Sequence, residues 1–205
     1  MKDKQLILTA RVLSLVFTPF YLSLVGVIAL FWLSYLGQMP TAYKLFVVLL
    51  TYFFTILLPT LLIHFYRRSQ GKHILTLAIK ERRTIPYLLS IVSYFTGIWV
   101  MGLLHIPGAV ASILTAAMFV QTVCALVNIW WKVSTHTAAI GGVVGALAAF
   151  SQIFLFNPTG WFCLTILLAG AVGTARMVLR QHTLGEVIAG FLLGTVTSYL
   201  SFALI

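Results

Sequence analysis

The chain has 205 residues, of which 61% are hydrophobic and only 8% are charged. Soluble domains carry roughly 25% charged residues, so this chain has too little polar surface to face water on all sides. Lys and Arg number 13 against 3 Asp and Glu, a formal net charge of +10. The basic residues occupy short segments between apolar runs, where they suit anionic lipid headgroups or phosphate rather than nucleic acid. We therefore expect an integral membrane protein that binds no nucleic acid.

Apolar runs long enough to cross a bilayer, about 20 residues each, follow one another along the whole chain. Seven can be separated, at about residues 12–36, 42–65, 86–104, 109–131, 137–156, 160–179 and 183–205. Six is the alternative count, which applies if the third or fourth run lies in the membrane interface. The sequence thus predicts an all-α bundle of six or seven transmembrane helices that forms a single domain over residues 1–205. The density of Gly141, Gly142 and Gly145 in the fifth run is typical of closely packed membrane helices.

Each span carries the chain across the membrane, so every second break between spans lies on the same side. The N-terminus and segments 67–83, 132–136 and 180–183 therefore share one side, and nearly all the charge gathers there. This predicts a cationic site at the surface of a cell membrane, either the inner or the plasma membrane. The positive-inside rule favours the cytoplasmic face for that site, although cations that bind a substrate distort the rule.

The segment before the last run carries the first chemical motif. His182 and Glu186 are four residues apart at a helix start, so they share one helix face. A carboxylate bonded to one imidazole nitrogen fixes the tautomer and makes the other nitrogen a better base or nucleophile. Arg176, six residues before His182, can bind phosphate oxygens with two N–H groups.

The segment before the fifth run carries the second motif, in which His136 follows Ser134 and Thr135. Backbone N–H groups and the helix dipole at such a helix start favour an anion. Two histidines, several cations and one orienting acid fit phosphoryl transfer, which needs a nucleophile, a proton donor and charge stabilisation. No ligand cluster has the spacing of a metal site, so we expect neither a metal nor another cofactor.

At these residues the chain resembles the type-2 phosphatidic acid phosphatase superfamily, which is related to the vanadium haloperoxidases. The family's third motif, Ser-Arg-x5-His-x3-Asp, is matched in spacing from Arg176 through His182 to Glu186, with alanine for serine and glutamate for aspartate. Its second motif, Pro-Ser-Gly-His, appears as Val-Ser-Thr-His at 133–136. Its first motif, Lys-x6-Arg-Pro, is degenerate in Lys-Glu-Arg-Arg-Thr-Ile-Pro at 80–86.

The resemblance covers about residues 80–190, implies a phosphatase-like core over about 80–205, and assigns roles to the motif residues. His182 would attack phosphorus and become a phosphohistidine, oriented by Glu186, while His136 would protonate the leaving lipid oxygen. A cationic and polar set would hold the phosphoryl oxygens: Arg176, Lys80, Arg82, Arg83, Ser134 and Thr135. The implied protein is a metal-independent membrane phosphatase for a phosphate monoester or diphosphate of a lipid.

Several alternatives stay open at this level. A non-enzymatic transporter or flippase of phosphate-bearing lipids would use the same basic side for binding alone. The substrate class spans phosphatidate, phosphatidylglycerophosphate, polyprenyl diphosphate and lipid A phosphate. In many members of the family that this chain resembles, the site faces outward from the cytoplasm, which is the opposite of the orientation that the positive-inside rule favours here. Oligomeric state and the choice among basic residues 80–83 are not predicted.

Overall fold

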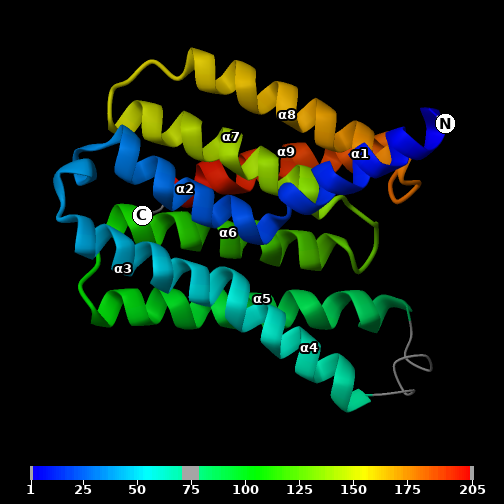
Figure 1. The fold of residues 1–205 in the computed structure, drawn as a ribbon, viewed down its shortest axis with the longest axis horizontal. Coiled ribbons are helices and arrows are strands. Elements are labelled where there is room, and N and C mark those ends of the chain that lie inside the picture. Colours follow the sequence, from blue (N-terminus) through cyan, green and yellow to red (C-terminus); the bar gives the residue numbers. More distant parts are fainter. Residues whose placement is uncertain (1, 71–78, 204–205) are drawn as a thin grey trace.

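Figure 1 shows the computed structural model of the protein, a bundle whose helices run mostly along its long axis. The structure describes residues 2–70 and 79–203, with the side chains of residues 4–32, 34–70 and 84–202. The helices are α1 (Lys2–Val16), α2 (Pro19–Leu33), a 3-10 turn (Tyr35–Gln38), α3 (Thr41–Tyr52), a π-helical segment (Phe53–Leu57), α4 (Leu58–Gln70), α5 (Ile79–Leu103), α6 (Gly108–Val127), α7 (Thr135–Ile153), α8 (Thr159–Val178) and α9 (Leu184–Ala203). No strand occurs among these residues, which confirms the predicted all-α fold.

Six helices are long and apolar enough to cross a bilayer. One is the continuous helix Thr41–Gln70, which joins α3 to α4, and the others are α5 to α9. Helices α1 and α2 form a pair bent by 57°, which makes a seventh span if the pair crosses as one. The predicted count of six or seven spans is confirmed, and the chain is an integral membrane protein.

Two helix boundaries differ from the sequence prediction. The first span was expected as one run over residues 12–36, but α1 already begins at Lys2 and the chain turns before Pro19. Proline has no N–H to donate and its fixed φ suits the first turn of a new helix, so α2 starts there. Pro86, expected at a helix start, instead lies inside α5, because this helix extends beyond its apolar part into the polar surface.

Helices α7 and α9 pack against each other more closely than a side chain would allow. A Cβ atom on Gly194 would lie 1.9 Å from the carbonyl oxygen of Ala138, and one on Gly141 would lie 2.1 Å from that of Phe191. Only glycine permits these approaches, which confirms the close packing predicted from the glycine-rich fifth run. The contact fixes the axial register of two helices whose first turns carry the candidate chemistry.

The polar breaks meet at one end of the bundle, on the right of Figure 1. The N-terminus, the end of α4, the start of α5 and the breaks before α7 and α9 all lie there. The main buried apolar cluster includes Val27, Leu36, Val47, Met101 and Leu114, from α2, α3, α5, α6 and the 3-10 turn. The bundle is therefore held together by apolar packing, and its polar groups concentrate at the end that carries the candidate site.

Candidate active site

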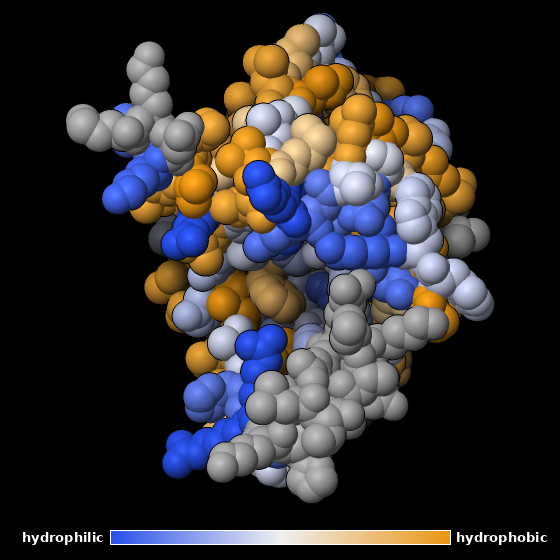
Figure 2. Space-filling model, turned by 90° about the vertical axis from the view of Figure 1, so that its right-hand side faces the viewer, coloured by the Kyte–Doolittle hydropathy of each residue, from blue (hydrophilic) through white to orange (hydrophobic). Residues whose placement is uncertain are grey.

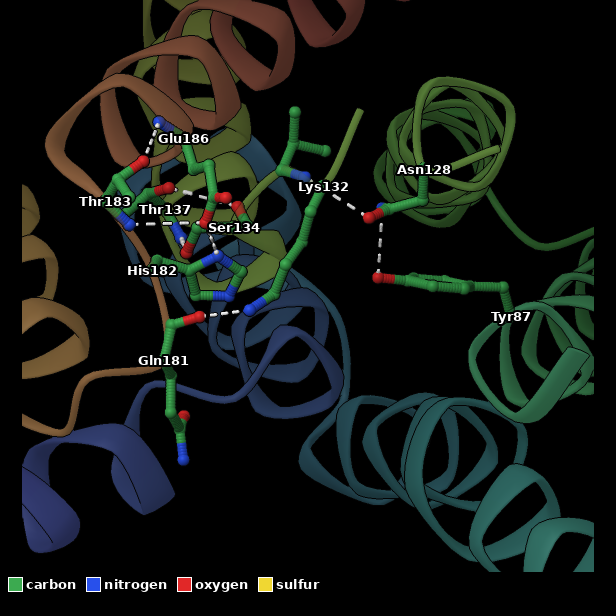
Figure 3. Close-up of polar contacts among 10 residues, drawn as sticks. Tyr87, Asn128, Lys132, Ser134, Thr137, Gln181, His182, Thr183 and Glu186 are labelled. Atoms are coloured by element: carbon green, nitrogen blue, oxygen red, sulfur yellow. Dashed lines mark hydrogen bonds and ion pairs between the residues drawn. The ribbon is translucent and has the colours of Figure 1, made fainter. Parts of the chain in front are cut away.

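His182 and Glu186 form the pair that their spacing predicts. The Nδ1 atom of His182 lies 2.8 Å from Oε2 of Glu186 (Figure 3). The same carboxylate oxygen accepts a bond from the backbone N–H of Thr183 at 3.2 Å, while the Thr183 hydroxyl accepts from the Glu186 N–H at 3.4 Å. This reciprocal arrangement is a capping box at the start of α9. Glu186 therefore closes the helix end and orients the imidazole with one carboxylate.

The imidazole of His182 is enclosed, with its side chain 7% exposed. Burial lowers the pKa of His182 below its ordinary value, and the positive charges of Lys132 and Arg176 lower it further, against the raising effect of the Glu186 hydrogen bond. The neutral imidazole is thus favoured near neutral pH. With Nδ1 bonded to the carboxylate, Nε2 carries the free lone pair, which is the form a nucleophile requires.

The segment that joins α6 to α7 packs directly against this pair. The Lys132 ammonium donates to the carbonyl of Gln181 and lies beside the His182 ring (Figure 3). Asn128 braces the segment, because its Oδ1 accepts from the N–H of Val133 at 3.2 Å and its Nδ2 donates to the hydroxyl of Tyr87 at 3.4 Å. Sequence reasoning missed Lys132 as a site residue. Its place two residues before Ser134 was the available signal.

His136 and Arg176 meet at a residue that sequence reasoning did not select, Ser14 of α1. His136 Nε2 lies 3.1 Å from the Ser14 carbonyl oxygen, and Arg176 donates from one terminal nitrogen to the Ser14 hydroxyl at 2.7 Å. His136 Nδ1 and Arg176 Nε are both buried without a hydrogen-bond partner. These two unmatched atoms belong to the residues expected to contact phosphate.

Ser134 and Thr135 lie where the second motif places them, at the start of α7. Ser134 is fully buried and caps the helix, because its hydroxyl accepts from the N–H of Thr137 at 3.5 Å. Its own N–H donates to the Glu186 carbonyl at 3.2 Å. The second and third motifs are therefore joined through the backbone, and direct phosphate contact by Ser134 and Thr135 stays a prediction.

The sequence model of the PAP2 superfamily matches residues 115–205. This segment contains His136, Arg176, His182 and Glu186. Residues 115–205 are therefore similar in sequence to the PAP2 superfamily. Members of this superfamily are generally phosphatases, which supports a phosphatase-type activity for the protein. No curated protein and no solved structure matches the chain.

The first motif lies before the PAP2 match, and the structure places it only by its backbone. Lys80, Arg82 and Arg83 belong to the first turns of α5, and their side chains fall outside those that the structure describes. Tyr87, which follows in the same helix, reaches the site through Asn128. The start of α5 is therefore at the correct end of the bundle, and phosphate binding by the three basic residues stays a prediction.

The end of the bundle that carries the PAP2 residues is polar and hollowed. Figure 2 shows hydrophilic side chains gathered on this face around a recess, with hydrophobic surface at the periphery. Within residues 2–70 and 79–203, no group of three or more His, Cys, Asp or Glu side chains is placed to hold a metal ion. The described groups can supply a nucleophile, an acid and fixed positive charge.

Proposed function

We propose that the protein is a membrane-embedded phosphatase that hydrolyses a phosphate monoester or diphosphate of a lipid through a phosphohistidine at His182. The observation that carries the proposal is the 2.8 Å contact between His182 Nδ1 and Glu186 Oε2. It leaves Nε2 as the nucleophile at the polar end of a membrane bundle. Arg176 and His136 lie together near this pair through their shared partner Ser14.

The reaction then has two steps. Nε2 of His182 attacks phosphorus and forms a P–N bond, while the P–O bond to the lipid breaks and the leaving oxygen takes a proton from His136. Water next attacks phosphorus and gives one proton to His136, which restores the acid, while the P–N bond breaks, inorganic phosphate leaves and the neutral imidazole of His182 is restored. The negative charge of the phosphate favours the charged forms of His136 and Arg176 during the first step.

The decisive experiment separates the two histidines by leaving group. His182→Ala should abolish turnover with every substrate, since no phosphoenzyme can form. His136→Ala should lose roughly 10²–10⁴-fold with a lipid phosphate, whose alkoxide needs a proton. With p-nitrophenyl phosphate, whose leaving group is stable as an anion, His136→Ala should retain much more of its phosphorylation rate.

The measurement is single-turnover phosphorylation of purified protein in detergent, with dephosphorylation followed separately because His136 can also activate water. Residual activity in His182→Ala would show that the assigned nucleophile is wrong. The same would hold for the assigned acid if both variants responded alike to the leaving group. A transporter or flippase of phosphate-bearing lipids would release no phosphate at all.

The proposed chemistry uses no metal. The chain has only three acidic residues, and the carboxylate at the site is occupied with His182 and Thr183. Phosphate release should therefore persist in excess EDTA and be inhibited by vanadate, which mimics pentacoordinate phosphorus. Loss of activity on chelation, restored by added Mg²⁺ or Zn²⁺, would contradict this mechanism.

A further inference from the structure

The bend between α1 and α2 lies where the candidate site meets a large apolar cavity. This cavity has a volume of about 510 Å³, extends into the membrane part of the bundle and is lined by residues of α2, α6, α7 and α8. Phe17 and Thr18, from the bend itself, line it together with Thr135 and His136 at the start of α7. The end of α1 therefore borders both the candidate catalytic groups and the apolar cavity.

Helix α1 buries very little of its own surface at this place. Among residues 4–16, whose side chains the structure describes, only Ala10 and Ser14 are buried, and they share one helix face because they are four residues apart. The helix packs against α8, which carries Arg176. It also lies outside the segment 115–205 that matches the PAP2 superfamily. Ser14 is thus a buried polar residue that enters the site from a separate part of the chain.

The carbonyl group of Ser14 fixes the tautomer of His136. A helix does not bond its last four carbonyl groups internally, and α1 ends at Val16, so the Ser14 carbonyl can accept from another partner. The Nε2 atom of His136 lies 3.1 Å from it. Because a carbonyl oxygen only accepts, Nε2 must carry a proton and donate it. The nitrogen left to exchange a proton during the reaction is Nδ1, which is buried without a hydrogen-bond partner.

The hydroxyl group of Ser14 orients the guanidinium group of Arg176. It accepts a hydrogen bond from Nη1 at 2.7 Å. The N–H of Nε and one N–H of Nη2 are parallel on another edge of the planar guanidinium, and two such parallel bonds can hold a phosphate. On that edge, Nε is buried without a hydrogen-bond partner. Ser14 therefore holds one side of the guanidinium and leaves the two-bond edge for phosphate.

Resting on the phosphatase activity proposed above, we propose that Ser14 is a positioning residue that completes the site from α1: its carbonyl sets the Nε2–H form of His136, and its hydroxyl holds Arg176 for phosphate. In the first step, charged His136 gives its Nδ1 proton to the leaving oxygen and keeps the Nε2 proton on Ser14. When water attacks phosphorus and the P–N bond breaks, water returns one proton to Nδ1. Ser14 acts through the two side chains and forms no bond to the substrate.

The first test measures the affinity for inorganic phosphate by calorimetry, with purified protein in dodecylmaltoside, because this binding requires no turnover. Ser14→Ala removes the acceptor of Arg176 and should weaken phosphate binding roughly tenfold, the effect of one hydrogen bond to a charged group. In an Arg176→Gln background the same substitution should have no further effect. The matched control is Thr9→Ala, which removes an exposed hydroxyl of the same helix that donates to the Gln5 carbonyl at 3.0 Å. This control should bind phosphate as the parent protein does.

The second test determines the tautomer of His136. Nitrogen-15 spectra of histidine-labelled protein distinguish a protonated ring nitrogen from an unprotonated one. They are recorded at about pH 8, above the ordinary histidine pKa of about 6.5. The His136→Ala spectrum identifies the signals of His136 among those of the five histidines. We expect Nε2 to be protonated and Nδ1 unprotonated, both in the parent protein and in Ser14→Ala, which keeps the backbone carbonyl.

Each outcome bears on one proposal. A phosphate affinity that Ser14→Ala leaves unchanged, or lowers equally with and without the Arg176 side chain, overturns the positioning of Arg176 even if the protein hydrolyses lipid phosphates. A proton on Nδ1 in place of Nε2 overturns the positioning of His136. The expected binding and tautomer in a protein that releases no phosphate from any lipid would support the positioning role of Ser14 and overturn the proposed catalysis.

Discussion

Lys132 and His182 lie side by side in the site, and this proximity predicts a pH dependence. His182 must be neutral to act as the proposed nucleophile, and burial together with the charge of Lys132 lowers its pKa below the ordinary value. In the parent protein the acid limb of kcat/KM should therefore lie below the ordinary histidine pKa of about 6.5. Lys132→Met removes one charge that lowers the pKa of His182, so the acid limb should move to higher pH.

The matched control is Lys132→Arg, which keeps the charge and should keep the limb near its original position. The free substrate has the same phosphate pKa in all three experiments. A difference in the position of the acid limb between the three proteins therefore comes from the enzyme. The measurement is kcat/KM across pH 4–9 at low salt, where charge interactions are least screened. An acid limb that stays in place in Lys132→Met would contradict the nucleophilic role of a neutral His182.

At the residue scale, sequence could predict what depends on local geometry. The pairing of His182 with Glu186 follows from helical spacing alone, and the structure has it at 2.8 Å. The contact of His136 with Ser14 joins residues 122 apart in sequence, and no local pattern encodes such a contact. The capping role of Ser134 was partly predictable, because a serine directly before a helix start is a common helix cap.

At the scale of helices, a glycine-to-alanine substitution usually stabilises a helix, but at the α7–α9 contact we expect it to destabilise the protein. Gly194→Ala places a methyl group where the Ala138 carbonyl lies 1.9 Å away, so the two helices must separate. The unfolding temperature should fall, and phosphate release should fall by about 10²-fold if the catalytic groups shift by about 1 Å. Both can be measured on detergent-purified protein.

Gly170→Ala on α8 is the control, because a Cβ there meets nothing within 4 Å. Alanine is favoured over glycine in a helix interior by about 0.5–1 kcal/mol, so this variant should be as stable as the parent or more stable. Equal stability of the two variants would mean that α7 and α9 are not held in contact as described.

The predicted helix starts were accurate where a proline precedes the apolar run. The runs at 109–131 and 160–179 begin within one residue of α6 and α8, and the second also ends within one residue of α8, whereas the first extends four residues beyond the end of α6. The sequence did not predict the bend between α1 and α2 before Pro19, because apolar residues continue through it and hydropathy carries no information on helix direction. The cavity was also beyond prediction, since the residues that line it look alike in sequence whether they face a ligand, a neighbour or lipid.

For the whole molecule, the distribution of charge predicts an orientation. Helix α1, with Lys4 and Arg11, and the last turn of α4, with Arg67 and Arg68, lie toward the end that carries the site, whereas α3, with Lys44 in its first turn, begins at the opposite end (Figure 1). The positive-inside rule then places the site in the cytoplasm. Ser69→Cys, exposed at the end of α4, should react with a membrane-impermeant maleimide only after cells are lysed.

Gln38→Cys, exposed at the opposite end, is the matched position and should react in intact cells. Both variants are made with Cys163→Ser, because Cys163 is the exposed native thiol among the described residues and Cys124 is buried. The reverse pattern, in which the Ser69 position reacts before lysis, would place the site outside the cytoplasm.

The cavity opens sideways, since exposed Val25, Trp161 and Leu164 are among the residues that line it. With hydrolysis as proposed, the two products therefore leave into different phases. The lipid alcohol partitions into the bilayer through this lateral opening, whereas phosphate stays on His182 until water releases it to the aqueous side. Dilution of the membrane with inert lipid should then slow the first step through the substrate's mole fraction, while hydrolysis of the phosphoenzyme keeps its rate.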